Sequence, residues 1–242
     1  MNIKNISLLT FLFLLINTVS YSQNIRGNGK VKKETREVTD FNKIVLQGKF
    51  NVILTQGQGE GIDIETDENL LELFQTHVKE NILYLTMIAA IKKSVKLNVY
   101  ISVKSINSLT LLDQISLKSE NIIHFDSLTV LMGGMSQMNF QLYAEYFNLQ
   151  LYDGSYANLT GYSETFIAHV HDETELDAFK LHVDYCNILS SGLTDSKVYV
   201  NKTLNLFVTG ASNLYYMGNA KINQRVFSST GFIVKRQEIN KQ

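Results

Sequence analysis

A sequence repeat with a period of about 19 residues constrains the fold of this chain more than any other feature. Six segments can be aligned, and their last residues follow one another at steps of 19, 21, 17, 20 and 18. Within each segment apolar and polar residues alternate, which is the two-residue spacing of a β-strand. A near-constant period with matching columns is typical of stacked repeats. The segments are residues 109–115, 128–134, 149–155, 166–172, 186–192 and 204–210.

This pattern predicts an all-β protein, a right-handed parallel β-helix (β-solenoid) with coils of about 19 residues. The chain of 242 residues contains no proline, which fits a protein made of hydrogen-bonded strands because proline lacks the donor that a ladder needs. We expect Leu206 to lie in register with Val130, Leu151 and Ala168 in one core. The single cysteine, Cys186, falls in an inward column and is expected to pack as a small hydrophobe.

The chain is predicted to consist of a cleaved signal peptide and a mature domain. Residues 1–22 resemble a signal peptide, with Lys4 before an apolar run at 6–16 and small residues before Gln23. Eleven apolar-rich positions are too few to span a bilayer, so we expect no membrane span after cleavage and an exported protein in the periplasm, on the outer surface or secreted. Residues 23–242 are predicted to form one β-solenoid domain. It would comprise N-terminal coils with one short helix (23–105, helix at 67–78), then regular coils and a C-terminal cap (106–242).

Charge and cysteine content exclude several classes of partner and site. Between residues 109 and 218 there are four lysines, no arginine and twelve acids, a net charge of −8. Such an acidic region argues against nucleic acid and anionic membranes as partners. One cysteine excludes an internal disulfide and a cysteine-based zinc site. We therefore expect no cofactor.

One outward column of the repeat is more apolar than a solvated face requires. Three places before each segment end it holds apolar or aromatic residues in five of six cases, with His169 as the exception. Contiguous exposed apolar patches mark interaction surfaces, so the column predicts a site for a glycan or a protein at the cell surface, or for a second copy of the chain. Alternatively, the chain itself covers the column. The predicted binding residues are Leu112, Leu131, Tyr152, Leu189 and Phe207 of this column, together with Tyr156, which flanks it.

Two chemical alternatives remain open. His169, His171, Glu173 and Glu175 would point to one side of a strand and could bind a divalent metal, although exposed polar side chains are the default on a solvent-facing strand. Carboxylates on a β-helix face could also hydrolyse glycosides if two of them stand across a groove. The candidates for that chemistry are Asp153, Asp172, Glu173 and Asp177.

The two ends of the repeat region resemble a known family. Residues 204–219 read Leu-Asn-Leu-Phe-Val-Thr-Gly-Ala-Ser-Asn-Leu-Tyr-Tyr-Met-Gly-Asn. This run resembles the closing motif of the auto-transporter adhesin head GIN family, a Ser-Gly-Ala-Ser array that ends in Tyr-x-Gly-Asn-Pro. Ala220 replaces the proline. Residues 27–29, 40–41, 50–57 and 67–70 resemble the opening of the same family. The resemblance implies an exported β-solenoid of bacterial envelopes and brings no catalytic residues with it.

These observations lead us to expect a non-catalytic, adhesin-like binding protein of the cell envelope or surface. A carbohydrate-active enzyme with carboxylates on a β-helix face is the first alternative. A structural envelope protein that self-assembles through the apolar column is the second.

Overall fold

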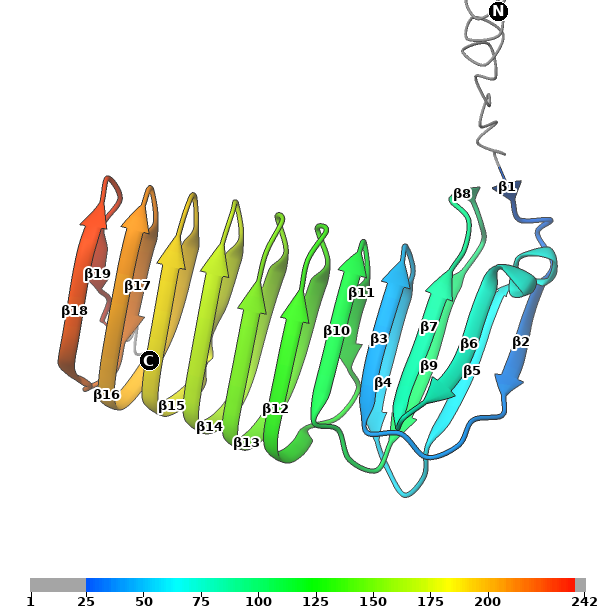
Figure 1. Cartoon of the computed structure of the whole chain (residues 1–242), viewed down its shortest axis with the longest axis horizontal. Coiled ribbons are helices and arrows are strands. Elements are labelled where there is room, and N and C mark those ends of the chain that lie inside the picture. The colour runs from blue at the N-terminus through cyan, green and yellow to red at the C-terminus, as the bar shows by residue number, and fades with distance from the viewer. Residues whose placement is uncertain (1–24, 238–242) are drawn as a thin grey trace, which may run out of the picture.

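The computed structural model describes residues 25–237 as one elongated stack of coils (Figure 1). The predicted signal peptide, residues 1–22, lies outside the described residues. In chain order the elements are β1 (Ile25–Arg26), β2 (Val31–Arg36), β3 (Lys43–Gly48), β4 (Asn51–Gln56), β5 (Gly61–Asp67), η1 (Glu68–Leu73), β6 (Phe74–Lys79), β7 (Ile82–Met87), β8 (Ile91–Lys93), β9 (Leu97–Val103), β10 (Ser108–Asp113), β11 (Ser116–Ser119), β12 (Ile123–Met132), β13 (Gln137–Leu151), β14 (Tyr156–His171), β15 (Glu175–Ser191), β16 (Asp195–Gly210), β17 (Asn213–Met217), β18 (Lys221–Ser229) and β19 (Ile233–Lys235).

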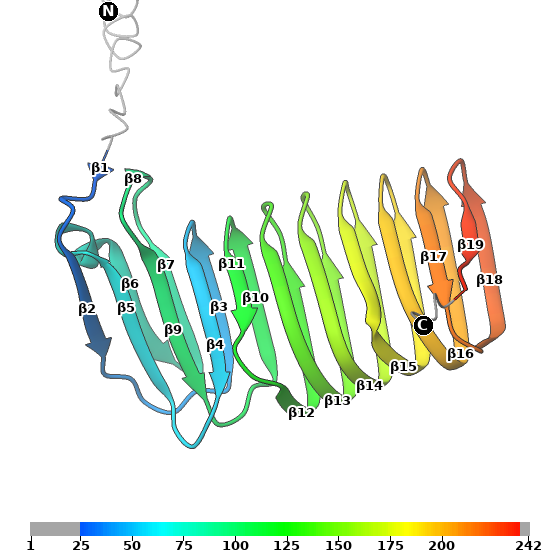
Figure 2. The ribbon, with the colours of Figure 1, turned by 180° about the vertical axis from the view of Figure 1, so that it is seen from behind.

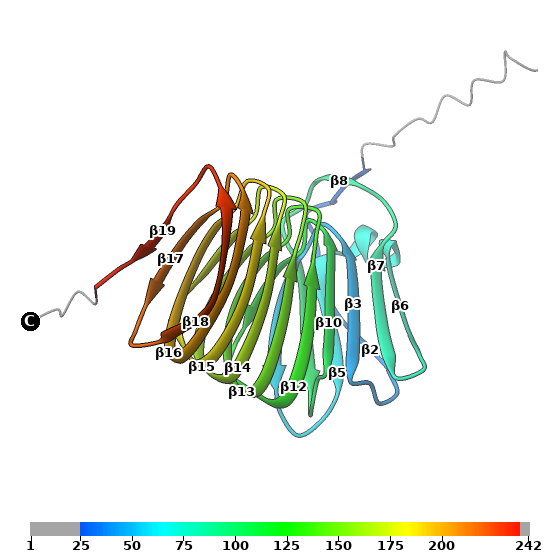
Figure 3. The same ribbon diagram turned by 60° about the vertical axis from the view of Figure 1, so that its left-hand side comes forward.

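The strands form two facing layers, seen obliquely from the C-terminal end of the stack in Figure 3. Layer A faces the viewer in Figure 1 and contains β6, β7, β3, β10 and β18 together with the parts of β12 to β16 that precede each tight turn. Layer B faces the viewer in Figure 2 and contains β2, β5, β9, β4, β11, β17 and β19 with the parts that follow each turn. Long strands such as β13 bend around a corner and so belong to both layers. The ladder therefore runs continuously through seventeen strands.

The coils wind in a right-handed sense. In Figure 1 the strands of layer A run upward, the chain turns over the top, descends in layer B and advances toward the left. All ladders between successive coils from β10 to β19 are parallel. The prediction of a parallel β-helix is thus confirmed.

The order of coils in space differs from their order in the chain near the N-terminus. The coil β3–β4 lies between β7–β9 on one side and β10–β11 on the other. In Figure 1 this appears as a blue coil between two green ones. Beyond β7–β9, three antiparallel strands (β2, β5 and β6) end the stack. The sequence pattern alone did not indicate this insertion.

The helix expected at 67–78 is shorter than predicted. Only Glu68–Leu73 is helical, as a 3-10 turn, and Phe74–Lys79 is strand β6. Leu70 and Phe74 are buried, as the helical pattern required. A short apolar run with buried residues at two spacings fits a helix or a strand, and here pairing with β7 decides the outcome.

Inward side chains of both layers fill the interior in stacked columns. One column contains Val130, Leu149, Ala168, Ile188 and Leu206, all at most 1% exposed. The predicted register was therefore wrong at one position, since Leu149 and not Leu151 lies in this column. A shift of two residues leaves every side chain on the same face of a strand, so alternation in the sequence does not detect it.

The tight turns give the true period of the stack. Each turn places a residue with positive φ in one shared column, and the residues of this column follow at steps of 21, 19, 19, 20 and 18. This column holds only glycine and aspartate, as the left-handed region favours. At Gly134 a Cβ would lie 2.6 Å from the Cα of Asp113 in the preceding coil, so this position also needs glycine for space. The column is Asp113, Gly134, Asp153, Asp172, Gly192 and Gly210.

Candidate functional site

The predicted binding residues lie on two neighbouring columns of layer A and one column of layer B. Leu131, Leu189 and Phe207 share a layer A column with Gln150 and His169. All five side chains are half-buried, and no segment passes over this face in Figure 1. The outward column is therefore an open surface, which we call the layer A stripe. It consists of Leu131, Gln150, His169, Leu189 and Phe207.

Leu112 and Tyr152 lie beside the layer A stripe and not within it. Leu112 pairs with Gln47, and Tyr152 follows Leu151, whose partner Val170 precedes His171. The Tyr152 and His171 rings stack at a centroid distance of 5.1 Å. The prediction that Leu112 and Tyr152 belong to the column of Leu131, Leu189 and Phe207 is wrong, because the first and third segments were aligned two residues too late. Both side chains still face outward from layer A.

Tyr156 is separated from the other predicted residues by the turn. It lies in layer B, where it pairs in register with Gln137 and Glu175. Burial raises the pKa of the Tyr156 phenol, and the carboxylates of Asp177 and Glu175 raise it further. It therefore belongs to a polar column and does not extend the layer A stripe.

The four predicted metal ligands do not converge. β14 ends at His171, Glu173 is in the turn with positive φ, and Glu175 begins the strand in layer B. The Nζ atom of Lys197 lies 2.9 Å from the Glu175 carboxylate. Burial lowers the pKa of His169, and the neighbouring His171 lowers it further. Among residues 25–237, no group of three His, Cys, Asp or Glu side chains is placed to hold a metal ion.

The acids considered for hydrolysis are dispersed over the turns and layer B. Asp153, Asp172 and Glu173 occupy tight turns, where their backbone has positive φ. Asp177 lies in layer B, 3.7 Å from the Lys197 Nζ atom. Three of the four acids therefore lie in the turns and one lies in layer B.

Cys186 packs inside the stack as predicted. It is 1% exposed, and burial raises the pKa of its thiol to about 12. The thiolate is the nucleophilic form of cysteine, so this side chain is a packing residue.

A groove in layer B was not predicted from the sequence. It has a volume of about 760 Å³ and lies where the connection from β7 to β9 projects past the turns of the neighbouring coils. Asn51 and Asn98 lie on its floor, and the Asn51 amide donates to the Asn98 side-chain oxygen at 3.1 Å. It continues into a depression of about 470 Å³ that shares both residues and also contains Asn139. We call this feature the layer B groove.

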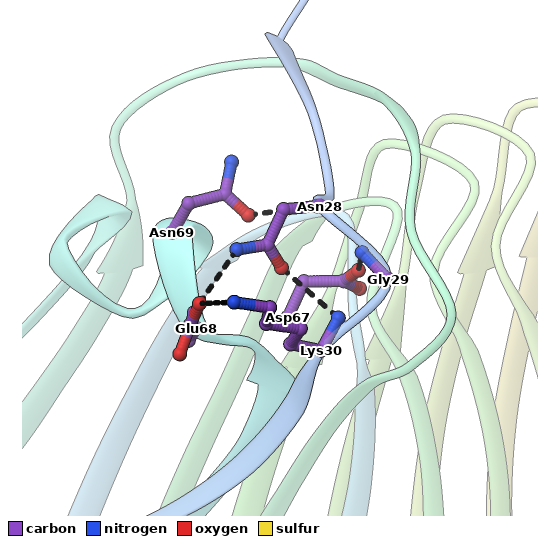
Figure 4. A network of polar contacts seen from close by, with 6 residues as sticks. All are labelled: Asn28, Gly29, Lys30, Asp67, Glu68 and Asn69. Carbon is purple, nitrogen blue, oxygen red and sulfur yellow. Dashed lines mark hydrogen bonds and ion pairs between the residues drawn. The ribbon is translucent and has the colours of Figure 1, made fainter.

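The wall of the layer B groove is held by a buried carboxylate. Asp67 is fully buried and accepts hydrogen bonds from the backbone N–H groups of Gly29 at 2.6 Å and Val95 at 2.8 Å. Val95 lies in the projecting connection, and β8 of that connection pairs with β1. Figure 4 shows the polar network around Asp67, in which Asn28 donates to Glu68 at 2.9 Å and Lys30 lies near the same carboxylate. One side chain thus ties the N-terminal segment to the groove wall.

A second feature missed from the sequence is an aromatic ladder in layer B near the corner. Five successive coils place an aromatic ring or a histidine in one outward column. Ring centroids of Tyr143 and Tyr162 are 5.3 Å apart, and those of His182 and Tyr199 are 4.3 Å apart. Its signal in the sequence is the 17- to 20-residue spacing of these residues. They are His124, Tyr143, Tyr162, His182 and Tyr199.

Within residues 25–237, no helix has the length and apolar character needed to cross a membrane.

The chain is similar in fold to several solved bacterial proteins. An adhesin from Bacteroides fragilis, named as putative, has a TM-score of 0.79 at 21% identity, over 88% of this chain and all of the other (100%). A protein from Parabacteroides distasonis named as a putative lipid binding protein has a TM-score of 0.73 at 15% identity, over 88% and 99%. A putative adhesin from Parabacteroides merdae has a TM-score of 0.69 at 19% identity, over 88% and 98%.

Sequence comparison identifies the family. No curated protein sequence shows significant similarity to the chain. Residues 40–220 match the family described as "Putative auto-transporter adhesin, head GIN domain". The match includes β3 to β17, and thus both the inserted coil and the regular stack. The chain therefore belongs to the head GIN family of auto-transporter adhesins.

Proposed function

We propose that this protein is an exported, non-catalytic binding module of the bacterial cell envelope or surface. Membership of an adhesin family supports a binding role. The observation that carries the proposal is the layer A stripe, where Leu131, Leu189 and Phe207 face outward half-buried, with the polar Gln150 and His169 between them and no covering segment. Surfaces of this kind bind partners because apolar and aromatic groups gain contact area at little entropic cost. The partner would be a glycan or a protein at the cell surface.

Two substitutions in the layer A stripe test the proposal. Leu189→Ser together with Phe207→Ser should shift the melting temperature by less than about 4 °C, because both side chains already contact solvent. The same variant should lose at least about tenfold in affinity for the ligand found by glycan array or cell-surface binding, as loss of an aromatic anchor does. Ile122→Ser is the matched control, since Ile122 is 50% exposed and lies outside layer A.

Three outcomes would contradict the proposal. A drop in melting temperature well beyond that of the control would place the two side chains in the core. Unchanged binding to glycans and cells would remove the layer A stripe as the binding surface. Release of sugar from a bound glycan would favour the carbohydrate-active enzyme.

A structural role through self-assembly is the second candidate, and the C-terminal end of the stack favours it. β18 and β19 are the last strands of the two layers in the described chain. Val226 is 43% exposed and Phe232 is 46% exposed at this end. Open strand edges with apolar side chains pair with other chains. Sedimentation of the intact protein over a concentration series would detect such assembly.

A further inference from the structure

We propose that the layer B groove binds a linear anionic saccharide. This inference deepens the proposed binding function by naming a ligand class and a second site for it. The volume of about 760 Å³ falls in the range of small-molecule sites. The groove forms where the regular stack is interrupted by the inserted coil β3–β4 and the long β7–β9 connection. The repeat itself therefore does not explain it.

The floor of the groove carries a row of neutral hydrogen-bonding groups. Asn98, Asn51, Ser116 and Gln137 follow one another in register on neighbouring strands. Neighbouring strands are about 4.8 Å apart, so the row offers an amide or a hydroxyl at each step along the stack axis. Amides donate and accept at once, as vicinal hydroxyl groups of a sugar require. A polymer that repeats such hydroxyls would fit a floor of this kind along its length.

The rims of the groove offer apolar contacts to the faces of sugar rings. Val95 on the projecting connection is 61% exposed, and Met135 in the opposite turn is 59% exposed. Both side chains line the groove, although apolar side chains of this size are usually more buried. Sugar rings present C–H groups on their faces and hydroxyls at their edges. Rims that are apolar above a floor that is polar match this distribution.

The charge at the groove is positive, in contrast to the acidic stack beside it. Lys49 and Lys96 line the groove. Lys96 is neutralised by Glu65, 2.7 Å away, and this bond is the main cause of the lowered pKa of Glu65. Among the described residues, Lys49 has no ion pair, and no acidic side chain lines the groove. The excess positive charge favours a ligand with carboxylate or sulfate groups.

The wall that carries Val95 is fixed before a ligand arrives. The Asp67 carboxylate holds the Val95 backbone, and β8 is paired with β1. A preformed wall lowers the entropy that binding must overcome. The ligand therefore meets a groove whose shape is already set.

Isothermal titration of the intact protein with defined saccharides tests this inference. The probes are polygalacturonate oligomers, which are carboxylated, dextran sulfate, and uncharged dextran. We expect at least one anionic probe to bind, with an affinity that falls as salt is added, and uncharged dextran to fail. Lys49→Gln and Asn51→Ala should each weaken binding by about fivefold or more, while Lys49→Arg should keep most of it. The matched control is Lys180→Gln, an exposed lysine without an ion pair among the described residues and remote from the groove.

The alternatives give different results. Equal binding of dextran, absence of binding by both anionic probes, or equal weakening by Lys180→Gln would overturn the inference. Loss of saccharide binding in the Leu189→Ser, Phe207→Ser variant, with full binding in Lys49→Gln, would place the ligand on the layer A stripe. In that case the inference fails while the proposed function stands. If the Leu189→Ser, Phe207→Ser variant binds as wild type does while Lys49→Gln loses saccharide binding, the reverse holds. The layer B groove is then the binding site, and the layer A stripe is not.

Discussion

Asp67 is the residue at which local sequence and tertiary structure disagree most. An aspartate before a short helical pattern is expected to cap the helix, yet its side chain makes no cap bond. It accepts instead from Gly29 and Val95, at sequence distances of 38 and 28 residues. Burial raises the pKa of its carboxyl, but backbone donors lower it by more, so the pKa lies below its ordinary value. The charged form is therefore the one that stabilises the fold.

The pH dependence of stability should report this carboxylate. Because the pKa of Asp67 is lowered by folding, its contribution is complete above the unfolded pKa of about 3.9 and disappears as pH falls through the lower folded value. Asp67→Asn should lower the free energy of unfolding at pH 7, by an amount on the order of the 1.5–3 kcal/mol of one hydrogen bond to a charged group. Urea unfolding at pH 7 and at pH 3 measures this. A loss that is the same size at both pH values would contradict the assignment.

Other single residues could be read from the sequence because their columns are regular. Cys186 was expected inside and is buried. Asp172 shares its turn column with glycines and other aspartates, and its positive φ shows that the turn accepts aspartate for its backbone conformation. Leu112 and Tyr152 were assigned to the wrong column, since a shift of two residues preserves the alternation that the sequence displays. Lys49 had no signal at all, because the groove depends on strands distant in the chain.

At the scale of elements, period and alternation identified the strands of the regular stack well. β13 to β16 each bend through a corner, so each contributes to both layers. The segment Phe74–Lys79 was expected in a helix and is a strand, because pairing with β7 outweighs a weak local preference. Local patterns thus predicted inward and outward faces correctly, and failed where a distant partner decides the type of element.

The inward column of layer A predicts a sharp contrast between adjacent positions. Leu206→Asp should abolish the folded stack, because a carboxylate without a partner in this core costs several kcal/mol, which is comparable with the total stability of about 5–15 kcal/mol. Asn205→Asp is the control, since Asn205 faces outward and donates to Asn187. Circular dichroism during heating should show a melting temperature near that of wild type for the control alone. A cooperative transition at the wild-type temperature in Leu206→Asp would mean that the residue is not inside.

For the whole molecule, coils are stacked in an order that the sequence does not reveal. A solenoid adds coils in chain order, and the repeat from β10 onward does so. The coil β3–β4 instead has β7–β9 and β10–β11 as its neighbours. The strands β3 and β4 do not differ in composition from the other strands of the stack. The position of this coil is decided only by which strand edges pair with it. The fold class was therefore predictable, whereas this topology and the groove that depends on it were not.

Deletion of the inserted coil should be far more damaging than its place near the N-terminus suggests. Removing residues 38–58 leaves β7 and β9 without the strands that join them to β10 and β11, so the stack would contain a gap. We expect the deleted chain to lack a cooperative thermal transition. The comparison is deletion of residues 221–237, which removes the last coil and should lower the melting temperature while leaving the remaining stack folded. Folding of the first variant at the wild-type temperature would contradict the pairing.

The position of the inserted coil also determines the order in which strands can pair during synthesis. A chain is synthesised from its N-terminus, so β3 and β4 exist before either of their neighbours. β9 is complete only at Val103 and β11 only at Ser119. Until about half of the chain has been made, the earliest coil has two unpaired edges, and contacts of such long sequence separation form slowly. During vectorial synthesis or export, β3 and β4 therefore emerge well before the strands with which they pair. We expect the risk of misassembly to be greatest before residue 119 emerges.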